Sequence, residues 1–561
     1  MQKFLPVLAK YVFAILLFSP LSVLAQLNGS YVIQGKITDD HGNALPGASV
    51  QIKGTSLGAQ TDTNGQFEVT GNTKFPLKLV IRLMGYQPQE FEVKNSSSKV
   101  AIQLYTQSLL VNEVVVSASR QQEKLLRSPV AIEKLDIRAL KETPSATFYD
   151  ALGNLKGVQM TTAGLTFKVF NTRGFNVPNN FRFMQLVDGV DNQAATLGVP
   201  LGNAIGPTEL DISSVEVTPG ASSALYGMNA INGMSNLITK NPFQYQGFSV
   251  YQKVAVNHVG DDGGARLLTE TAVRYAQAYT PWFAWKINLS YMQGTDWYAD
   301  SHNDFSPQPV SNPDFPELSG PNNIANDAWN KYGDNANIQI LDKDGRAYTV
   351  HRTGYWEKDL VGDFTVRNKK ADISLNFRLP RKLELSASYR YGEMDGFFQR
   401  GNRIGLRGVT VQNAKLELVH PDFTIRSYIS IENTGDSYNM NPLADNLEKS
   451  FKPDKQWQAD YTTGLNNALT AGSGLVEAHQ AARTYADAGR WTPGTPAFDA
   501  QLAKIKSVND WDIYPTSKNP ENTTGGAHLL QMSRFYHTEG TWNLRKYVHF
   551  ADVLVGADYR T

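Results

Sequence analysis

The sequence has 561 residues, enough for about three or four ordinary domains, and its 53 lysine and arginine residues equal its 53 aspartate and glutamate residues. This balance leaves no overall positive field to attract nucleic acid or an anionic membrane surface, so a nucleic-acid partner is excluded. The sequence contains no cysteine, which excludes disulfides, thiolate nucleophiles and thiolate metal ligands.

Residues 1–25 have the pattern of a cleaved export signal. Lys3 and Lys10 precede an apolar run over residues 11–18, and Val23-Leu24-Ala25 supplies the small-residue cleavage pattern. An uncleaved anchor is the alternative, disfavoured because the apolar run is short. Later in the chain no apolar run approaches the roughly 18 residues of a membrane-spanning helix. Membrane β-strands stay open, because their alternation is lost in hydropathy averages.

Residues 26–106 read as short strands separated by turn residues. Strands are expected over residues 32–38, 50–53, 67–69, 77–83 and 100–104, with Asp39–Asn43, Pro46-Gly47 and Asp62–Gly65 as turns. This pattern predicts a small β-sandwich. The stretch GKITDDHGNALPGASVQIKGTSLGAQTDTNGQFEV resembles the carboxypeptidase-regulatory-like domain that precedes many outer-membrane receptors. None of the nine histidines has the His-x-x-Glu zinc spacing of such peptidases, so we expect no enzyme activity, metal or cofactor.

Residues 107–120 form a polar linker that contains three consecutive valines. One interpretation is a last strand of the sandwich. In the other, a β-branched segment in a flexible tether adds to the sheet edge of another protein, with main-chain hydrogen bonds supplying the affinity. The segment resembles the TonB box of TonB-dependent receptors. The resemblance implies pairing with TonB through Glu113, Val114, Val115, Val116 and Ser117.

Residues 121–242 carry four short motifs in a set order. A helix capped by Ser145 is expected to bear Phe148, Leu152 and Leu155 and to end near Gly157. The four motifs are Arg127–Val130, Asn171–Asn176, Gln185–Asp191 and Ala224–Gly227. In this order and spacing they resemble the plug domain of a TonB-dependent outer-membrane receptor, which implies an α+β fold.

The last part of this region, residues 210–240, predicts a strand, a turn at Pro219-Gly220, a short helix and a second strand. A phosphate-binding loop would need a Lys-Ser/Thr pair after its second glycine, but Gly227 is followed by Met228-Asn229. We therefore interpret the glycines as backbone hinges and close-packing points.

From residue 243 to residue 561 apolar and polar residues alternate with a period of two. The alternation is clearest over residues 283–291, 372–379, 383–391 and 423–431. A soluble antiparallel sheet with one face on a core would give the same pattern. Connection lengths favour a membrane barrel. The turns near residues 280, 380 and 421 are tight, whereas the connections over residues 295–361 and 434–534 are long. All tight turns are expected at one end and all long loops at the other.

The predicted protein is therefore mainly β: an N-terminal β-sandwich, an α+β plug domain and a partial transmembrane antiparallel β-barrel. We count about nine strands, the last over residues 547–559, whereas barrels with a plugged lumen have about 22. Because an open barrel edge in lipid leaves costly unpaired backbone groups, we expect the remaining strands to be missing from this chain.

The family resemblance implies energised uptake across the outer membrane of a large or scarce substrate, such as a siderophore, a vitamin complex or an oligosaccharide. The implied partners are TonB, with ExbB and ExbD, and outer-membrane lipid. A surface lipoprotein partner stays open, because residues 228–233 lack the Arg-Gly-Ala-Asn-Gly run of the glycan-importing SusC-like branch. The alternative function is a surface adhesin or binding scaffold without active transport. Candidate substrate-binding residues are Arg173, Asn179, Asn180, Phe181, Asn192, Gln193, Trp297, Tyr298, Trp329 and Tyr332.

Overall fold

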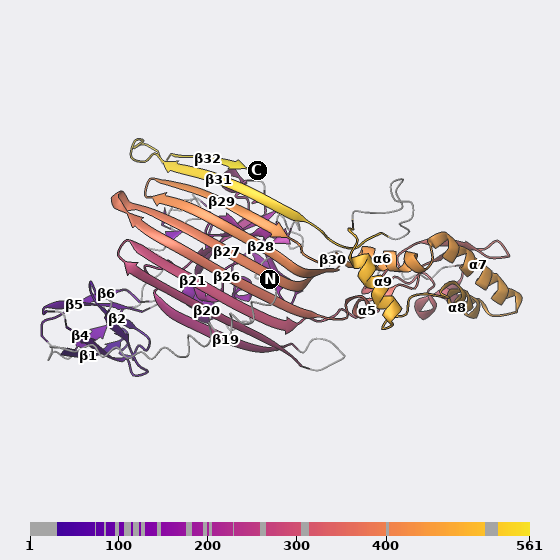
Figure 1. Cartoon of the computed structure of the whole chain (residues 1–561), viewed down its shortest axis with the longest axis horizontal. Helices are drawn as coiled ribbons and strands as arrows, with labels where there is room; N and C mark the ends of the chain where they lie inside the picture. Colours follow the sequence, from indigo (N-terminus) through magenta and orange to yellow (C-terminus); the bar gives the residue numbers. More distant parts are fainter. Residues whose placement is uncertain are drawn as a thin grey trace, which may run out of the picture. The chain divides into compact units, whose positions relative to one another are not determined.

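The computed structural model divides the chain into two units, Met1–Asn112 and Glu113–Thr561 (Figure 1). It describes residues 31–55, 57–72, 74–83, 86–95, 100–105, 114–115, 123–124, 130–142, 147–175, 182–194, 199–200, 205–227, 229–257, 265–304, 314–399, 403–510, 525–551 and 553–561. The expected export signal lies outside the described residues.

The first unit contains two sheets that enclose one apolar core. Strands β4–β1–β7 form one sheet and β3–β2–β5–β6 the other. Their bounds are β1 Tyr31–Thr38, β2 Ser49–Ile52, β3 Gly58–Gln60, β4 Gln66–Gly71, β5 Leu77–Arg82, β6 Gln89–Val93 and β7 Val100–Gln103. Ile33 and Ile37 of β1 are fully buried, as are Leu79 and Ile81 of β5. The predicted sandwich is confirmed. Strand β3 escaped prediction because Gly-Ala-Gln contains no β-branched residue.

The second unit begins with the elements expected to form the plug, a name we use for its described residues up to 246. A five-stranded sheet runs β10–β17–β18–β13–β14, in which only β13 and β18 pair in parallel. A hairpin, β11–β12, stands apart from this sheet. The bounds are β8 Val114–Val115, β9 Glu123–Lys124, β10 Glu133–Asp136, α2 Ile137–Glu142, α3 Phe148–Leu152, β11 Val158–Gly164, β12 Phe167–Thr172, β13 Phe183–Val187, β14 Val190–Asp191, β15 Gln193–Ala194, β16 Val199–Pro200, η2 Glu209–Asp211, β17 Ile212–Pro219, α4 Ser223–Tyr226 and β18 Gly233–Thr239.

The helix expected after Ser145 begins and ends elsewhere. Helix α3 follows Thr147, whose N–H donates to Asp150 Oδ2 at 3.3 Å, and it ends before Gly153. A carboxylate in the first turn can satisfy the backbone N–H that precedes the helix, which places the start at Thr147. Leu155 therefore lies in the turn after the helix. Ser145 lies outside the described residues.

The strand, turn, helix and strand predicted over residues 210–240 are present as β17, α4 and β18. Backbone φ is +91° at Gly220, which follows the first strand, and +133° at Gly233, where the second begins. A Cβ atom on Gly233 would lie 2.6 Å from Thr172 Oγ1. Glycine at residue 233 is therefore required both by the backbone and by close packing.

Nine long antiparallel strands form the sheet that we call the wall, and they follow one another in chain order across it (Figure 1). The number agrees with the predicted count. A short tenth strand, β30, pairs with β28 off this path. The bounds are β19 Gly247–Asn257, β20 Arg266–Thr280, β21 Phe283–Thr295, β26 Thr365–Leu379, β27 Leu383–Gln399, β28 Arg403–His420, β29 Phe423–Asn433, β30 Tyr438–Asn439, β31 Met532–Asn543 and β32 Leu554–Arg560.

The predicted alternation places polar residues against the plug and apolar residues on the opposite face. In β21, Lys286 and Asn288 are buried, whereas Leu289 is 49% and Tyr291 42% exposed. The same exposed face continues over the wall with Phe248, Val250, Val254, Val256, Leu267, Ile373, Leu375, Tyr389, Leu416, Ile425, Tyr536 and Trp542.

One connection differs from the predicted asymmetry. Tight turns join β20 to β21, β26 to β27 and β28 to β29 at one end of the wall, as expected. At the other end β27 and β28 are joined by only three residues, between Gln399 and Arg403. These two strands, of 17 and 18 residues, are longer than the other wall strands, and they stay paired with each other past the ends of those strands. Phe397 and Phe398, in this extended part of β27, are fully buried.

The two long connections fold into an α/β body that we call the outer insert, comprising the described residues of 297–364 and 434–531. Arg352 of the first segment pairs with Glu448 at 3.2 Å and with Asp454 at 2.8 Å in the second. Its helices gather beyond one end of the wall strands (Figure 1). The bounds are η3 Pro316–Leu318, η4 Gly320–Asn322, β22 Lys331–Tyr332, β23 Ile338–Leu341, β24 Ala347–Val350, β25 Tyr355–Trp356, α5 Glu357–Val361, α6 Met440–Phe451, α7 Asp454–Thr470, α8 Leu475–Ala486 and α9 Pro496–Lys506. Among the helices of the described ranges, none has the length and apolar character needed to cross a membrane.

Candidate functional site: the polar contact between plug and wall

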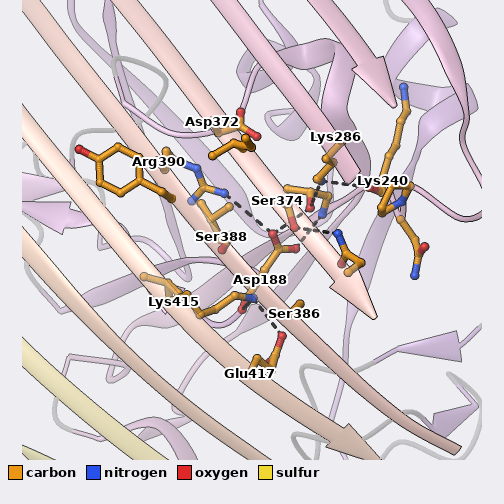
Figure 2. Close-up of a pocket in the computed structure, with 18 of the residues that line it drawn as sticks. Asp188, Lys240, Lys286, Asp372, Ser374, Ser386, Ser388, Arg390, Lys415 and Glu417 are labelled. Atoms are coloured by element: carbon orange, nitrogen blue, oxygen red, sulfur yellow. Dashed lines mark hydrogen bonds and ion pairs between the residues drawn. The ribbon is translucent and has the colours of Figure 1, made fainter. Parts of the chain in front are cut away.

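A cavity of about 190 Å³ lies between the plug and the inner face of the wall (Figure 2). The plug contributes Val187, Asp188, Val190 and residues 239–243, which lie at and after the ends of β13 and β18. Most wall residues of the lining are inward residues of β21, β26, β27 and β28, because alternate residues of a strand share one face. Charged and hydroxyl side chains line it, namely Asp188, Lys240, Lys286, Asp372, Ser374, Ser386, Ser388, Arg390, Lys415 and Glu417.

The first charged contact beside this cavity centres on Asp211, which is fully buried at the end of η2. Its carboxylate accepts from Arg274 Nε at 2.8 Å and from Lys286 Nζ at 2.6 Å. Lys286 also donates to Thr239 Oγ1 at 2.7 Å and to the carbonyl of Lys240 at 3.0 Å. Two wall cations therefore hold one plug carboxylate and the adjoining end of β18. A buried pair of this kind is costly to break from one side.

The second charged contact centres on Asp188, in the turn between β13 and β14. The N–H and Oγ1 of Thr239 each donate to its carboxylate at 2.8 Å, and Arg390 Nη2 lies 3.9 Å away. Lys415 donates to the Asp188 carbonyl at 3.3 Å. Burial alone would raise the pKa of Asp188, but the nearby cations Lys415, Lys286 and Arg390 and the Thr239 N–H hold it below its usual value.

A third contact lies farther along the wall, at Arg426. Its guanidinium donates to Glu539 at 2.6 Å and to the carbonyl of Gly189 at 3.4 Å, and it pairs with Glu417. In each of the three contacts the wall supplies the cation and the plug supplies a carboxylate or carbonyl oxygen. Ion pairs and charged hydrogen bonds of this kind hold the plug against the wall. The site is therefore an ion-paired interface.

The valines of the expected TonB box form a minimal strand within the second unit. Val114 pairs with Lys124 and Val115 with Glu123, antiparallel. Val115 is fully buried and clusters with Ile132. Glu113, Val116 and Ser117 lie outside the described residues.

The candidate substrate residues of the plug have different surroundings in the described part of the chain. Arg173 is exposed and has φ of +57°. Asn192 is buried, and its side-chain amide donates to the carbonyl of Ile205 at 3.2 Å. Gln193 lies in the short strand β15. Asn179, Asn180 and Phe181 lie outside the described residues.

The four aromatic candidates of the outer insert differ in exposure. Trp329 is 57% exposed. Tyr332 is buried, and its hydroxyl donates to Glu357 Oε2 at 3.3 Å. Tyr298 packs on Phe364, with ring centroids 5.8 Å apart. The carbonyl of Trp297 accepts from the guanidinium of Arg403 at 2.8 Å.

Sequence reasoning did not single out the residues that join plug and wall. Lys286 lies at an inward position of the predicted alternation, where a charged residue needs a buried partner, so the pattern contained a signal for it. The partner, Asp211, is far away in the chain and has no such signal.

Comparison with known proteins identifies two domains. A model described as "CarboxypepD_reg-like domain" matches residues 33–116, and "TonB-dependent Receptor Plug Domain" matches residues 124–234. "TonB-dependent receptor P39" of Formosa agariphila is 30% identical over 258 residues, covering 44% of this chain and 22% of the relative. "TonB-dependent receptor SusC" of Bacteroides thetaiotaomicron is 26% identical over 220 residues, covering 37% and 21%.

"Vitamin B12 transporter BtuB" of Vibrio cholerae is 32% identical over 139 residues, covering 24% of this chain and 22% of the relative. The matched region thus spans about a fifth of the length of each of these curated relatives. The matched plug coincides with the structural elements from β9 to the start of β18. The chain therefore carries a CarboxypepD_reg-like domain followed by a TonB-dependent receptor plug domain, and over part of its length it is similar to curated TonB-dependent receptors.

Proposed function

We propose that the protein is an outer-membrane receptor that takes up a large or scarce substrate with energy delivered through TonB. The observation that carries this proposal is the placement of the plug on the polar face of a nine-stranded wall whose other face is apolar and exposed. An apolar outer face suits lipid, and a polar inner face suits a lumen filled by a plug. On this proposal residues 1–25 are a cleaved export signal.

The TonB partner is proposed to pair with residues 113–117. The described part of this segment already has the extended backbone of a strand, because Val114 and Val115 pair with residues 123–124. A strand that pairs with only two residues leaves main-chain groups for another sheet edge. ExbB and ExbD are proposed to supply the energy to TonB, and a surface lipoprotein is a further proposed partner.

The proposed substrate class is a siderophore, a vitamin complex or an oligosaccharide. The relative from Vibrio cholerae is by its name a vitamin B12 transporter, which supports the vitamin member of this set. Within the described ranges, Arg173 and Trp329 are the members of our substrate set that are classed as exposed to solvent. We propose no reaction on the substrate, since binding and transfer suffice for uptake.

A proline at Val115 tests the assignment of the TonB box, because proline removes a main-chain donor from a strand. In cells that carry the receptor, Val115→Pro should abolish uptake of the cognate substrate and leave its surface binding intact. Ser108→Pro, in the same linker but outside the box, is the matched control and should leave uptake unchanged. Unchanged uptake by Val115→Pro would contradict the assignment.

The second candidate function, a surface adhesin or binding scaffold, is favoured by the size of the outer insert, which has its own buried cores around Leu443 and Trp457. A scaffold would keep its full activity when the proton gradient is collapsed by an uncoupler. A receptor would keep binding but lose uptake under the same treatment.

A further inference from the structure

A buried cluster of three charged side chains lies where the plug, the wall and the outer insert meet. Asp296 follows β21, Arg403 begins β28 and Glu357 begins α5 of the outer insert. Asp296 and Glu357 are fully buried, and Arg403 is 2% exposed. One guanidinium therefore serves two carboxylates in a place that water does not reach.

The tip of the plug hairpin β11–β12 is attached to this cluster through Asp296. The N–H of Leu165 donates to both carboxylate oxygens of Asp296 at 3.2 Å. A Cβ atom on Gly164 would lie 2.2 Å from the carbonyl oxygen of Phe397, so the tip is pressed against the wall. Any change in the charge or position of Asp296 therefore reaches the plug directly.

Glu357 attaches helix α5 of the outer insert to the same guanidinium. It is in ion-pair contact with Arg403 Nη1 and accepts from the N–H of Ala299 at 2.9 Å. Arg403 Nη2 lies 3.7 Å from Asp296, and Nε has no hydrogen-bond partner within the described residues. The shared cation is thus drawn closer to the insert than to the residue that holds the plug.

We propose that Asp296 and Glu357 compete for Arg403, so that a rearrangement of the outer insert changes how firmly the plug tip is held. When α5 moves Glu357 away, Arg403 is free to pair with Asp296, which keeps Asp296 ionised and therefore a good acceptor for the Leu165 N–H. When Glu357 draws Arg403 toward the insert, Asp296 loses its counter-ion and the tip is loosened. The proposal goes beyond uptake, because it concerns a coupling within the chain.

The protonation of Asp296 follows the same competition. Burial raises its pKa to about 6, Arg403 opposes the rise, and Glu357 adds to it. Burial also raises the pKa of Glu357, against the effects of Arg403 and of the Tyr332 hydroxyl. A carboxylate that becomes protonated is a weaker acceptor for a backbone N–H. Removing the charge of Glu357 should therefore keep Asp296 ionised to lower pH.

Hydrogen exchange at the Leu165 amide tests the competition in the full chain, in detergent micelles and without TonB. Asp296→Asn should speed the exchange of this amide, corrected for its intrinsic rate, by about threefold or more. Glu357→Gln should slow it, and in wild-type chain protection should fall as the pH drops through about 6. The opposite signs separate competition from general loosening of the fold, which would speed exchange in both variants.

Glu448→Gln is the matched control. Glu448 is also a buried carboxylate of the outer insert between two arginines, Arg352 at 3.2 Å and Arg490 at 2.9 Å, but both of these arginines belong to the insert itself. It should leave Leu165 exchange unchanged. Faster exchange in Glu357→Gln, or equal effects of Glu357→Gln and Glu448→Gln, would overturn the proposal. Because exchange is measured without transport, either result leaves the uptake proposal standing.

Discussion

Lys286 of the wall and Asp211 of the plug form an ion pair of 2.6 Å across 75 residues of sequence. Both side chains are buried, and the same lysine also contacts the end of the last plug strand. The pair therefore holds the point where the chain leaves the plug to enter the wall. Its burial decides how much its loss should cost.

Lys286→Met should destabilise the second unit by about 3 to 5 kcal/mol, because it leaves Asp211 buried with one of its two cations missing. The measurement is the midpoint of urea unfolding in detergent. Lys369→Met is the control, since Lys369 pairs with Glu393 at 2.6 Å in the same wall but is half exposed. It should change stability by less than about 1 kcal/mol. Equal losses of stability in the two variants would show that the buried ion pair stabilises the fold no more than the exposed one.

Gly233→Ala should destabilise the plug by about 1 to 3 kcal/mol beyond the cost of its positive φ alone, because the new Cβ would clash with Thr172 Oγ1. Gly247→Ala separates the two costs. Gly247 also has positive φ, +99°, but a Cβ there meets nothing within 4 Å. If the two variants unfold at the same urea concentration, close packing at residue 233 is not the reason for its glycine.

The wall and the sandwich could be predicted because their signal is local. Alternation over residues 283–291 fixes which side chains face inward, and the structure confirms it at Lys286 and Leu289. The start of α3 could not be placed, because Ser145 and Thr147 are both good caps and only the contact with Asp150 decides between them.

The helices of the outer insert, in contrast, have a local signal in the sequence, although they were not predicted from it. Trp457, Tyr461 and Leu465 recur at every fourth residue, which is typical of the buried stripe of a helix, and all three are fully buried in α7. The contacts across this body, such as Arg352 with Glu448, depend on how two distant segments meet. No residue spacing in the sequence predicts a contact between distant segments. The contact of Asp211 with Lys286 could not be predicted for the same reason.

The outer insert should lose stability in mild acid through His479. Burial, with the positive charge of Arg483, lowers the pKa of this histidine to about 4, and its Nδ1 lies 3.0 Å from the hydroxyl of Tyr461. The unfolded chain binds a proton near the usual histidine pKa while the folded chain does not. The contribution of His479 to the free energy of unfolding is therefore fully present above about pH 6.5. It falls by about 3 kcal/mol as the pH drops toward 4.

His479→Phe should remove this part of the pH dependence, since phenylalanine keeps an aromatic ring beside Tyr348 and cannot bind a proton. Hydrogen exchange of α8 at pH 7.5 and pH 4.5 measures the effect in wild type and variant. The difference between the two pH values should be smaller in the variant. An unchanged difference would assign the acid sensitivity to other groups.

A charged residue should be tolerated less well in place of an exposed leucine on the apolar face of the wall than in place of a similarly exposed leucine elsewhere. Leu289, on the outward face of β21, is 49% exposed, and Leu341, in β23 of the outer insert, is 61% exposed. If lipid covers the wall, Leu289→Arg should destabilise the folded chain in a bilayer by about 2 to 4 kcal/mol, because arginine is poorly solvated among acyl chains. Leu341→Arg should have little effect, since water solvates the new charge. Comparing urea unfolding of both variants in outer-membrane lipid decides the matter. An equal, small effect would mean that lipid does not cover the wall at Leu289, and the membrane placement of this strand would have to be abandoned.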